Sequence, residues 1–279
     1  MKHTEGEFTA FNNWQLYYQA WQPDVAPKAA LIIVHGVGEH SGRYMNLISP
    51  LLAKGYAVYS FDHRGHGRSP EGLAAHVNDW REYRQDLKLF VDFVRGQQEL
   101  RPLFLLGHSM GGLITANYVL HYPQGLQGVV LSSPPLGDIG VSPVLRFLGR
   151  LLALIKPDFA LGNGLDVNAI SRDPEAVRQY LSDPLVHDRV TAQWSVEFFQ
   201  AIDWTQAQAA DFKPPLLIIH GDADAMVPCQ ASRSFFDQVG QVDKSYIAYP
   251  GGFHENFNDL HQQQAAADVG AWLDQHLTS

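Results

Sequence analysis

Cysteine is nearly absent from this sequence, because Cys229 is the only one among 279 residues. A disulfide within the chain is therefore excluded, and so is a metal site built from paired cysteines. Scarce cysteine is typical of proteins from reducing compartments, and we predict a cytoplasmic location. Cys229 itself is expected to be a small buried or loop residue.

Long apolar runs are also missing. No uninterrupted apolar stretch approaches the roughly 20 residues that a membrane-spanning helix needs. Charged residues, among them Lys2, Glu5 and Glu7, occupy the amino terminus, where an export signal would have an apolar run. We expect neither a transmembrane helix nor an export signal, and attachment to a membrane surface is a separate hypothesis.

The sequence also lacks clusters of residues with the same charge. The formal net charge of −9 is spread along the chain without the grouped Lys and Arg residues of a nucleic-acid site, so nucleic acid is not an expected partner. With 46% hydrophobic and 18% charged residues, the composition is that of a globular protein. The length fits one main domain with a lid-sized insertion. The sequence contains no indication of the oligomeric state.

Apolar runs rich in β-branched residues alternate with longer helical patterns along most of the chain. This alternation predicts an α/β protein with a mostly parallel central sheet flanked by helices. The predicted central strands are residues 30–35, 57–61, 103–107, 128–132, 216–220 and 244–249. The predicted helices are residues 44–54, 79–99, 110–121, 230–239 and 262–276. Before them, a turn signal at Asn12-Asn13, between residues 7–12 and 14–21, predicts an antiparallel hairpin at the sheet edge.

The alternation stops after Pro134-Pro135 and resumes at Pro214-Pro215. We interpret residues 136–212 as an inserted helical cap, and residues 1–135 and 213–279 as the core. An insertion beyond the carboxyl ends of the strands would lie where open α/β sheets bind ligands.

Residues 107–111 read Gly-His-Ser-Met-Gly, between the apolar run 103–106 and a helical pattern. A G-x-S-x-G motif between a strand and a helix is typical of a nucleophile elbow, a sharp turn that exposes the serine. Gly107 and Gly111 lack the Cβ atoms that such a turn would crowd. Ser109 is therefore the predicted nucleophile, with its oxygen near the amino end of the following helix.

A neutral serine hydroxyl is a weak nucleophile, so it needs a base, and the base needs an orienting acid. After a nucleophile elbow, the acid and then the histidine follow in loops at the carboxyl ends of later strands. His254 lies in the last such loop, after two glycines, and is the predicted general base. Asp222 and Asp224 share the preceding loop. We favour Asp224 because an apolar segment follows it, and Asp222 is the alternative.

Attack on an ester creates an oxyanion, which needs preorganised backbone donors. Met110 follows the nucleophile and is one predicted donor. Val37, in the glycine-rich stretch 35–38 after an early strand, is the second. His35 in the same stretch is expected to be a structural hydrogen-bonding residue rather than a second base.

Three motifs are distinctive: Val-His-Gly-Val-Gly-Glu-His-Ser-Gly-Arg-Tyr at residues 34–44, Phe-Asp-His-Arg-Gly-His-Gly-Arg-Ser at 61–69, and the elbow at 107–112. Together with Tyr-Leu-Ser-Asp-Pro-Leu at residues 180–185, they resemble the monoacylglycerol lipase and lysophospholipase branch of the α/β-hydrolase superfamily. The resemblance covers nearly the whole chain. It implies the α/β-hydrolase fold with a helical cap.

The same resemblance implies a carboxylic ester hydrolase without metal or organic cofactor, which cleaves monoacylglycerols to fatty acid and glycerol through an acyl-enzyme. It also implies that Glu39, Arg43 and Tyr180 line a polar pocket for the glycerol hydroxyls. An ordinary salt bridge and a packing role are the alternatives for these residues. Some family members have a second histidine three positions after the catalytic one. This chain has Phe257 there, which puts glycerol recognition in doubt rather than catalysis.

Other activities remain open within the same fold. A lysophospholipase and a broad carboxylesterase would share this machinery and differ only in the head-group pocket. A non-catalytic ligand receptor is an alternative of another class, although neither a degenerate triad nor a missing oxyanion loop supports it. Dehalogenases of this fold need an aspartate in place of Ser109 and are set aside.

A helix predicted at residues 141–156 has an unusually wide apolar face. Nine apolar residues fall within an arc of roughly 180°, whereas packing on one core usually demands roughly 100°. We hypothesise that part of this face points outward and makes peripheral contact with a membrane, where Arg146, Arg150 and Lys156 meet anionic head groups. Burial of both flanks is the alternative. The apolar residues are Val141, Val144, Leu145, Phe147, Leu148, Leu151, Leu152, Leu154 and Ile155.

Overall fold

A computed structural model of the chain describes residues 1–69, 72–98 and 101–277. Within these residues, the centre is an eight-stranded sheet in the order β1-β2-β4-β3-β5-β6-β9-β10. The antiparallel pairs are β1 with β2 and β2 with β4, and the neighbours from β4 to β10 are parallel. The strands are β1 (Lys2–Thr9), β2 (Gln15–Gln22), β3 (Ala29–Val34), β4 (Tyr56–Phe61), β5 (Leu103–His108), β6 (Gly128–Ser132), β9 (Leu216–Gly221) and β10 (Lys244–Tyr249).

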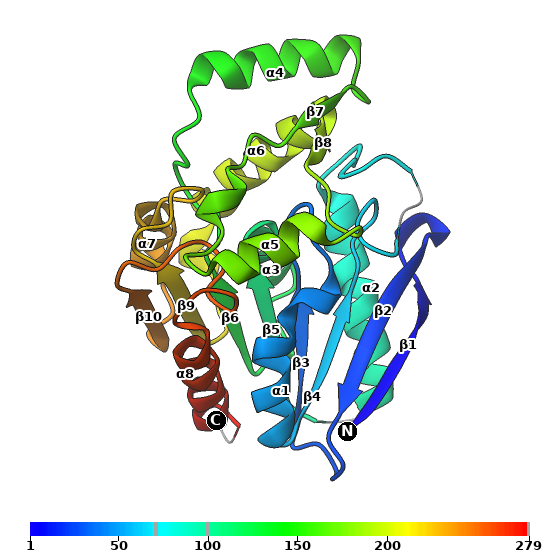
Figure 1. Cartoon of the computed structure of the whole chain (residues 1–279), viewed down its shortest axis with the longest axis vertical. Helices are drawn as coiled ribbons and strands as arrows, with labels where there is room; N and C mark the ends of the chain where they lie inside the picture. Colours follow the sequence, from blue (N-terminus) through cyan, green and yellow to red (C-terminus); the bar gives the residue numbers. More distant parts are fainter. Residues whose placement is uncertain (70–71, 99–100, 278–279) are drawn as a thin grey trace.

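Helices cover both faces of the sheet (Figure 1). One face packs against α1 (Met45–Ala53) and α8 (Gln262–Gln275). The other packs against α2 (Arg81–Gln98), α3 (Met110–His121) and α7 (Cys229–Gln238). Parallel strands between two helical layers are buried on both faces, which explains why the central strands read as continuous apolar runs.

The six predicted central strands and the five predicted core helices are all confirmed, with ends that differ by two residues at most. The predicted end of the second helix, Glu99, lies outside the described residues. The hairpin is also confirmed, and Asn12 and Asn13 in its turn have φ angles of 59° and 62°. Its first strand begins at Lys2 and not at residue 7 as predicted. The missed residues are mostly exposed at the sheet edge, so they show no apolar alternation.

The segment between β6 and β9 was predicted to be only helical, and this is wrong in one respect. It contains α4 (Pro143–Ile155), α5 (Pro174–Ser182), α6 (Ala192–Ala207) and the short helices η3 (Val167–Ala169) and η4 (Ala209–Asp211). It also contains an antiparallel strand pair, β7 (Ala160–Gly162) and β8 (Arg189–Thr191). Strands of three residues are too short to show a periodic pattern, and their pairing across α5 is not local.

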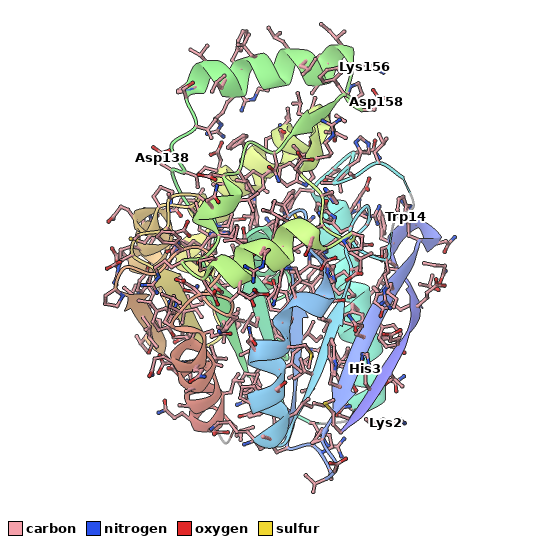
Figure 2. The ribbon with its side chains drawn as sticks, viewed as in Figure 1. Lys2, His3, Trp14, Asp138, Lys156 and Asp158 are labelled. Atoms are coloured by element: carbon pink, nitrogen blue, oxygen red, sulfur yellow. The ribbon has the colours of Figure 1, made fainter. Side chains whose placement is uncertain are left out.

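Helix α4 lies outermost and projects from one end of the molecule (Figure 1). Ser142 caps its first turn by accepting a hydrogen bond from the backbone N–H of Leu145, and Pro143 fits the first helical position. Ala153 is the only buried residue of α4. Figure 2 shows its side chains projecting outward over the stretch between the labelled Asp138 and Lys156. No helix in the described part of the chain is long and apolar enough to span a bilayer.

Candidate active site

Ser109 lies in a tight turn between β5 and α3. Its φ and ψ angles are 51° and −124°, a left-handed backbone conformation that costs a non-glycine residue about 1–3 kcal/mol. A Cβ atom on Gly107 would lie 2.3 Å from the carbonyl oxygen of Gly111, and one on Gly111 would lie 2.0 Å from that of Val34. The backbone N–H of Ser109 donates to the carbonyl of Ser132 at 2.9 Å, which ties the turn to β6. The two glycines are therefore required by close backbone contacts.

Three side chains from three loops form a continuous series of hydrogen bonds. His254 Nε2 lies 2.9 Å from Ser109 Oγ, and His254 Nδ1 lies 2.6 Å from Asp224 Oδ2. Asp224 follows β9 and His254 follows β10, which are adjacent parallel strands. Loops at the same end of parallel strands meet at one sheet edge, so the topology brings these residues together.

The surroundings of Asp224 hold it ionised and oriented. Its Oδ1 accepts 2.9 Å hydrogen bonds from the backbone N–H groups of Met226 and Val227, and its Oδ2 lies 3.1 Å from His220 Nε2. Burial raises the pKa of Asp224, but His254 and the hydrogen bonds outweigh it, so the pKa lies well below its usual range.

Asp222, the alternative acid, is exposed in the same loop. Its Oδ1 accepts a 2.6 Å hydrogen bond from the backbone N–H of Gly251, which joins the β9 loop to the β10 loop. The geometry therefore places Asp224, and not Asp222, against His254.

His254 is buried, and its charge state depends on nearby carboxylates. Burial lowers its pKa, but Asp224, Glu255 and Glu39 outweigh burial and raise the pKa above 6.5. Because Nδ1 faces a carboxylate, Nδ1 holds the proton and Nε2 is free to accept one from Ser109. The neighbouring ring of His108 stays neutral, since burial and then His254 lower its pKa to about 3.

Val37 and Met110 line the same cavity as Ser109. In the part of the chain that the structure describes, their backbone N–H groups donate to no protein acceptor. The loop before Val37 is fixed on two sides: the N–H of Gly36 donates to Glu39 Oε1 at 2.6 Å, and His35 Nδ1 lies 2.7 Å from the carbonyl oxygen of Gly36. His35 is fully buried and acts within this hydrogen-bonding arrangement.

Two neighbouring spaces adjoin Ser109 and His254. The larger is a mainly apolar cavity of about 440 Å³ between the elbow and the inserted segment. Its apolar wall includes Leu161, Val190, Trp194, Phe198 and Phe199. The smaller is a recess of about 20 Å³, lined by Glu39, Tyr180 and Glu255 among others. The site thus has a large apolar side and a small side that contains the acidic groups of Glu39 and Glu255.

Glu39, Arg43 and Tyr180 contact one another, but they differ in whether they line the recess. Glu39 and Tyr180 line the recess, whereas Arg43 does not. Arg43 makes 2.6 and 2.9 Å hydrogen bonds to the two carboxylate oxygens of Glu255 and a 3.2 Å hydrogen bond to Glu39 Oε2. The ring of Tyr180 covers the guanidinium at 4.6 Å. Glu255 was not predicted from the sequence, although it directly follows His254.

Phe257 occupies the position at which some relatives have a second histidine. It is buried in the hydrophobic cluster that includes α1 and α8, and its ring centroid lies 6.5 Å from that of Tyr44. Its side chain therefore belongs to the core.

Histidine rings gather beside the loop that contains Val37. The ring centroid of His35 lies 4.2 Å from that of His63 and 5.4 Å from that of His66. Burial lowers the pKa of His35 to about 4 and holds the pKa of the other two well below the usual range. Among the described residues, no group of three or more His, Cys, Asp or Glu side chains is arranged to hold a metal ion.

Known proteins resemble this chain in sequence and in structure. A family model described as "Serine aminopeptidase, S33" matches residues 25–261. A monoacylglycerol lipase of Mycolicibacterium smegmatis is 36% identical over 276 residues, which is 98% of each chain. A phospholipase of Bacillus subtilis is 30% identical over 260 residues, which is 92% of this chain and 99% of that one. The crystal structure of a monoacylglycerol lipase from Paleococcus ferrophilus is 35% identical, with a TM-score of 0.85, and the match covers 94% of this chain and 99% of that one.

Proposed function

Because the chain belongs to the serine aminopeptidase S33 family and has the α/β-hydrolase fold, we propose that it cleaves monoacylglycerols to fatty acid and glycerol. One observation carries the proposal: hydrogen bonds link Ser109, His254 and Asp224 at the wall of an apolar cavity. The monoacylglycerol lipase relatives support the substrate class.

The proposed reaction proceeds through an acyl-enzyme. Ser109 Oγ attacks the ester carbonyl carbon while His254 Nε2 accepts the hydroxyl proton, and Asp224 remains ionised and stabilises the imidazolium. The bond to the glycerol oxygen then breaks, and His254 returns the proton to the departing oxygen. A water molecule, deprotonated by His254, next attacks the acyl carbon. The bond between the acyl carbon and Ser109 Oγ then breaks, His254 returns the proton to Oγ, and the fatty acid is released.

We assign the oxyanion to the backbone N–H groups of Val37 and Met110. Both line the cavity at Ser109, and Met110 is the first residue of α3, where the helix dipole favours negative charge. A single donor of this kind typically contributes about 10²–10³ to kcat.

The larger space beside Ser109 suits the acyl half of a monoacylglycerol, and the recess has room for about one hydroxyl group. The acyl chain would occupy the apolar cavity, and one glycerol hydroxyl would lie in the recess against Glu39 and Tyr180. Arg43 would act from behind the recess by holding both of these side chains in place.

The inserted residues 136–212 act, in this proposal, as a cap over the core formed by residues 1–135 and 213–279. Several of them, including Leu161, Trp194 and Phe198, supply the apolar wall of the cavity. Helix α4 would bring the enzyme into peripheral contact with a lipid surface, because most of its apolar side chains are exposed.

Lysophospholipase activity is the second candidate, and the phospholipase relative favours it. The two activities use the same triad and differ in the alcohol that leaves. A broad carboxylesterase would differ from both by accepting esters without a glycerol part.

Release of fatty acid from a panel of monoacylglycerols, lysophospholipids and nitrophenyl esters tests the proposal. The parent should prefer monoacylglycerols and react with an active-site-directed fluorophosphonate. Ser109→Ala and His254→Ala should each reduce kcat by a factor of the order of 10⁶, and the double variant should be little worse, because the residues act as a unit. A Ser109→Ala variant that retains turnover would contradict the mechanism.

A further inference from the structure

Among the residues that the structure describes, those that line the cavities at Ser109 include acidic side chains but no lysine or arginine. The apolar cavity and the recess both reach Ser109, and a third cavity of about 290 Å³ shares Leu165, Tyr180 and Met226 with the recess. In the described part of the chain, the Asp, Glu, Lys and Arg side chains that line these three cavities are Asp166, Glu39, Glu255, Asp183 and Asp188. Burial raises the pKa of Glu39, so Glu255 and the three aspartates are the main carriers of negative charge. An anionic group bound beside Ser109 would therefore meet acidic side chains, because Arg43, the guanidinium that contacts Glu255 and Glu39, does not line these cavities.

Arg43 lies behind the recess, and its guanidinium is already occupied. Both of its Nη atoms bond to Glu255, at 2.6 and 2.9 Å, and Glu39 and the ring of Tyr180 contact it as well. Asn258 Nδ2 donates to Glu255 at 2.9 Å and fixes the carboxylate from the other side. Glu255 is ionised at neutral pH, because Arg43 outweighs the effect of burial and holds the pKa of Glu255 below its ordinary value.

We propose that Glu255 determines the leaving-group specificity: by occupying Arg43, it makes the site accept esters of uncharged alcohols and reject esters of phosphorylated alcohols. The guanidinium fork matches a carboxylate and a phosphate equally well, so the two compete for it. This inference rests on the proposed function and deepens it, because it separates monoacylglycerols from lysophospholipids with an anionic head group.

A matched pair of water-soluble esters provides the test. 1-Butyrylglycerol and 1-butyrylglycerol 3-phosphate share the acyl group and the glycerol, and they differ only in the phosphate. The parent should show a kcat/KM about thirtyfold or more higher for the uncharged ester, because repulsion of this order is expected between like charges in a partly buried site.

Three variants test whether the effect depends on phosphate binding by Arg43 or only on the loss of one negative charge from the protein. Glu255→Gln should reduce the ratio of the two kcat/KM values by about tenfold, because it removes the carboxylate that bonds both Nη atoms of Arg43 and competes with phosphate for them. Adding Arg43→Gln to this variant should abolish the gain. Glu7→Gln removes one exposed carboxylate on β1, far along the sheet from β9 and β10, and should leave the ratio unchanged.

The outcomes distinguish a failure of the proposed function from a failure of the inference about Glu255. If the parent hydrolyses neither ester, the proposed function has failed. If it hydrolyses both with equal kcat/KM, or if Glu255→Gln folds and leaves the ratio unchanged, only the inference is overturned.

A measurement on the parent decides the matter if Glu255→Gln does not fold. Raising the ionic strength from about 20 mM to about 300 mM should increase kcat/KM for the phosphate ester alone, because salt screens repulsion between like charges. A decrease would indicate an attractive cation at the site and would overturn the inference.

Discussion

Asp222 and Asp224 stand two positions apart in one loop, and their contacts differ completely. Asp224 is buried against His254, whereas Asp222 is exposed and bonds to the backbone of Gly251. Asp224→Asn should therefore reduce kcat by about 10⁴, because the histidine loses its orienting partner. Asp222→Asn, the matched control, should reduce kcat only mildly. The reverse order of the two variants, measured on a monoacylglycerol, would show that the acid is misassigned.

The charge state of His254 predicts the pH dependence. Only the neutral imidazole accepts a proton from Ser109, so kcat/KM should fall on the acid side as His254 becomes protonated. Since Asp224 and its neighbours raise the pKa of His254, the midpoint of this acid limb should lie above pH 6.5. Asp224→Asn removes the largest raising influence and should move the midpoint of its residual activity to lower pH. A nitrophenyl ester assay across pH measures both midpoints, and an unchanged midpoint would contradict the assignment.

Ser109 and His254, which the structure brings within hydrogen-bond distance, could be proposed from the sequence because their signals are local. A serine between two glycines at a strand end, and a histidine after the last strand, can be located along the chain alone. Glu255 could not be selected in this way. Its partner Arg43 comes from the short helix η2 (Ser41–Tyr44), which is distant in sequence, and only the folded chain brings the two into contact.

At the scale of an element, the turn from β5 to α3 depends on the absence of a side chain at residue 111. A Cβ there would lie 2.0 and 2.4 Å from the carbonyl oxygens of Val34 and His35, which belong to the backbone and cannot rotate away. Gly111→Ala should lower the free energy of unfolding by about 3 kcal/mol or more.

Gly96 in α2 provides the matched control for this substitution. It is exposed, and a Cβ on it would have nothing within 4 Å. Gly96→Ala should therefore raise the free energy of unfolding by about 0.5–1 kcal/mol, since alanine favours the helix. Urea denaturation of both variants measures the difference. If Gly111→Ala retained full stability and activity, the turn would be less tight than described.

Helices and strands could be predicted where their burial requires a regular pattern of apolar residues. Strands β3 and β5 are buried along their whole length, so their apolar runs marked them clearly. The start of β1 and the β7–β8 pair have no such pattern, because the first is a polar edge and the second consists of two short, partly exposed strands. Their positions depend on pairing with other strands, and a short stretch of sequence contains no information about that pairing.

At the scale of the whole molecule, α4 is the helix whose apolar side chains are mostly not packed against the rest of the protein. Its inner side contacts α6, where Arg146 pairs with Asp203 and lies over the ring of Phe199, so the expectation that Arg146 meets lipid head groups is wrong. The sequence predicted that part of the apolar face of α4 points outward, and the exposed fractions of its side chains agree with this. Large apolar side chains that are 42–85% exposed are Val144, Leu145, Phe147, Leu148, Leu151, Leu154 and Ile155. A continuous patch of this kind is typical of an interaction surface.

Lipid is the proposed partner of this patch, since α4 belongs to the segment that also walls the cavity at Ser109. Leu148→Ser with Leu151→Ser should weaken co-sedimentation with phosphatidylcholine and phosphatidylglycerol vesicles by about tenfold or more, because each leucine loses apolar burial in the interface. Activity on dispersed long-chain monoacylglycerol should fall in parallel, while activity on soluble butyrylglycerol should persist.

The control for these substitutions is Leu260→Ser, which removes an apolar side chain that is 65% exposed outside α4 and should change neither vesicle binding nor activity. Because Leu148 and Leu151 are themselves more than 40% exposed, the double variant should keep the circular dichroism spectrum and the urea midpoint of the parent. Equal vesicle binding by the folded variant and the parent would refute lipid docking. If sedimentation velocity then revealed a parent dimer that the variant loses, the patch would be a contact between two copies of the chain, and α4 would serve assembly rather than substrate delivery.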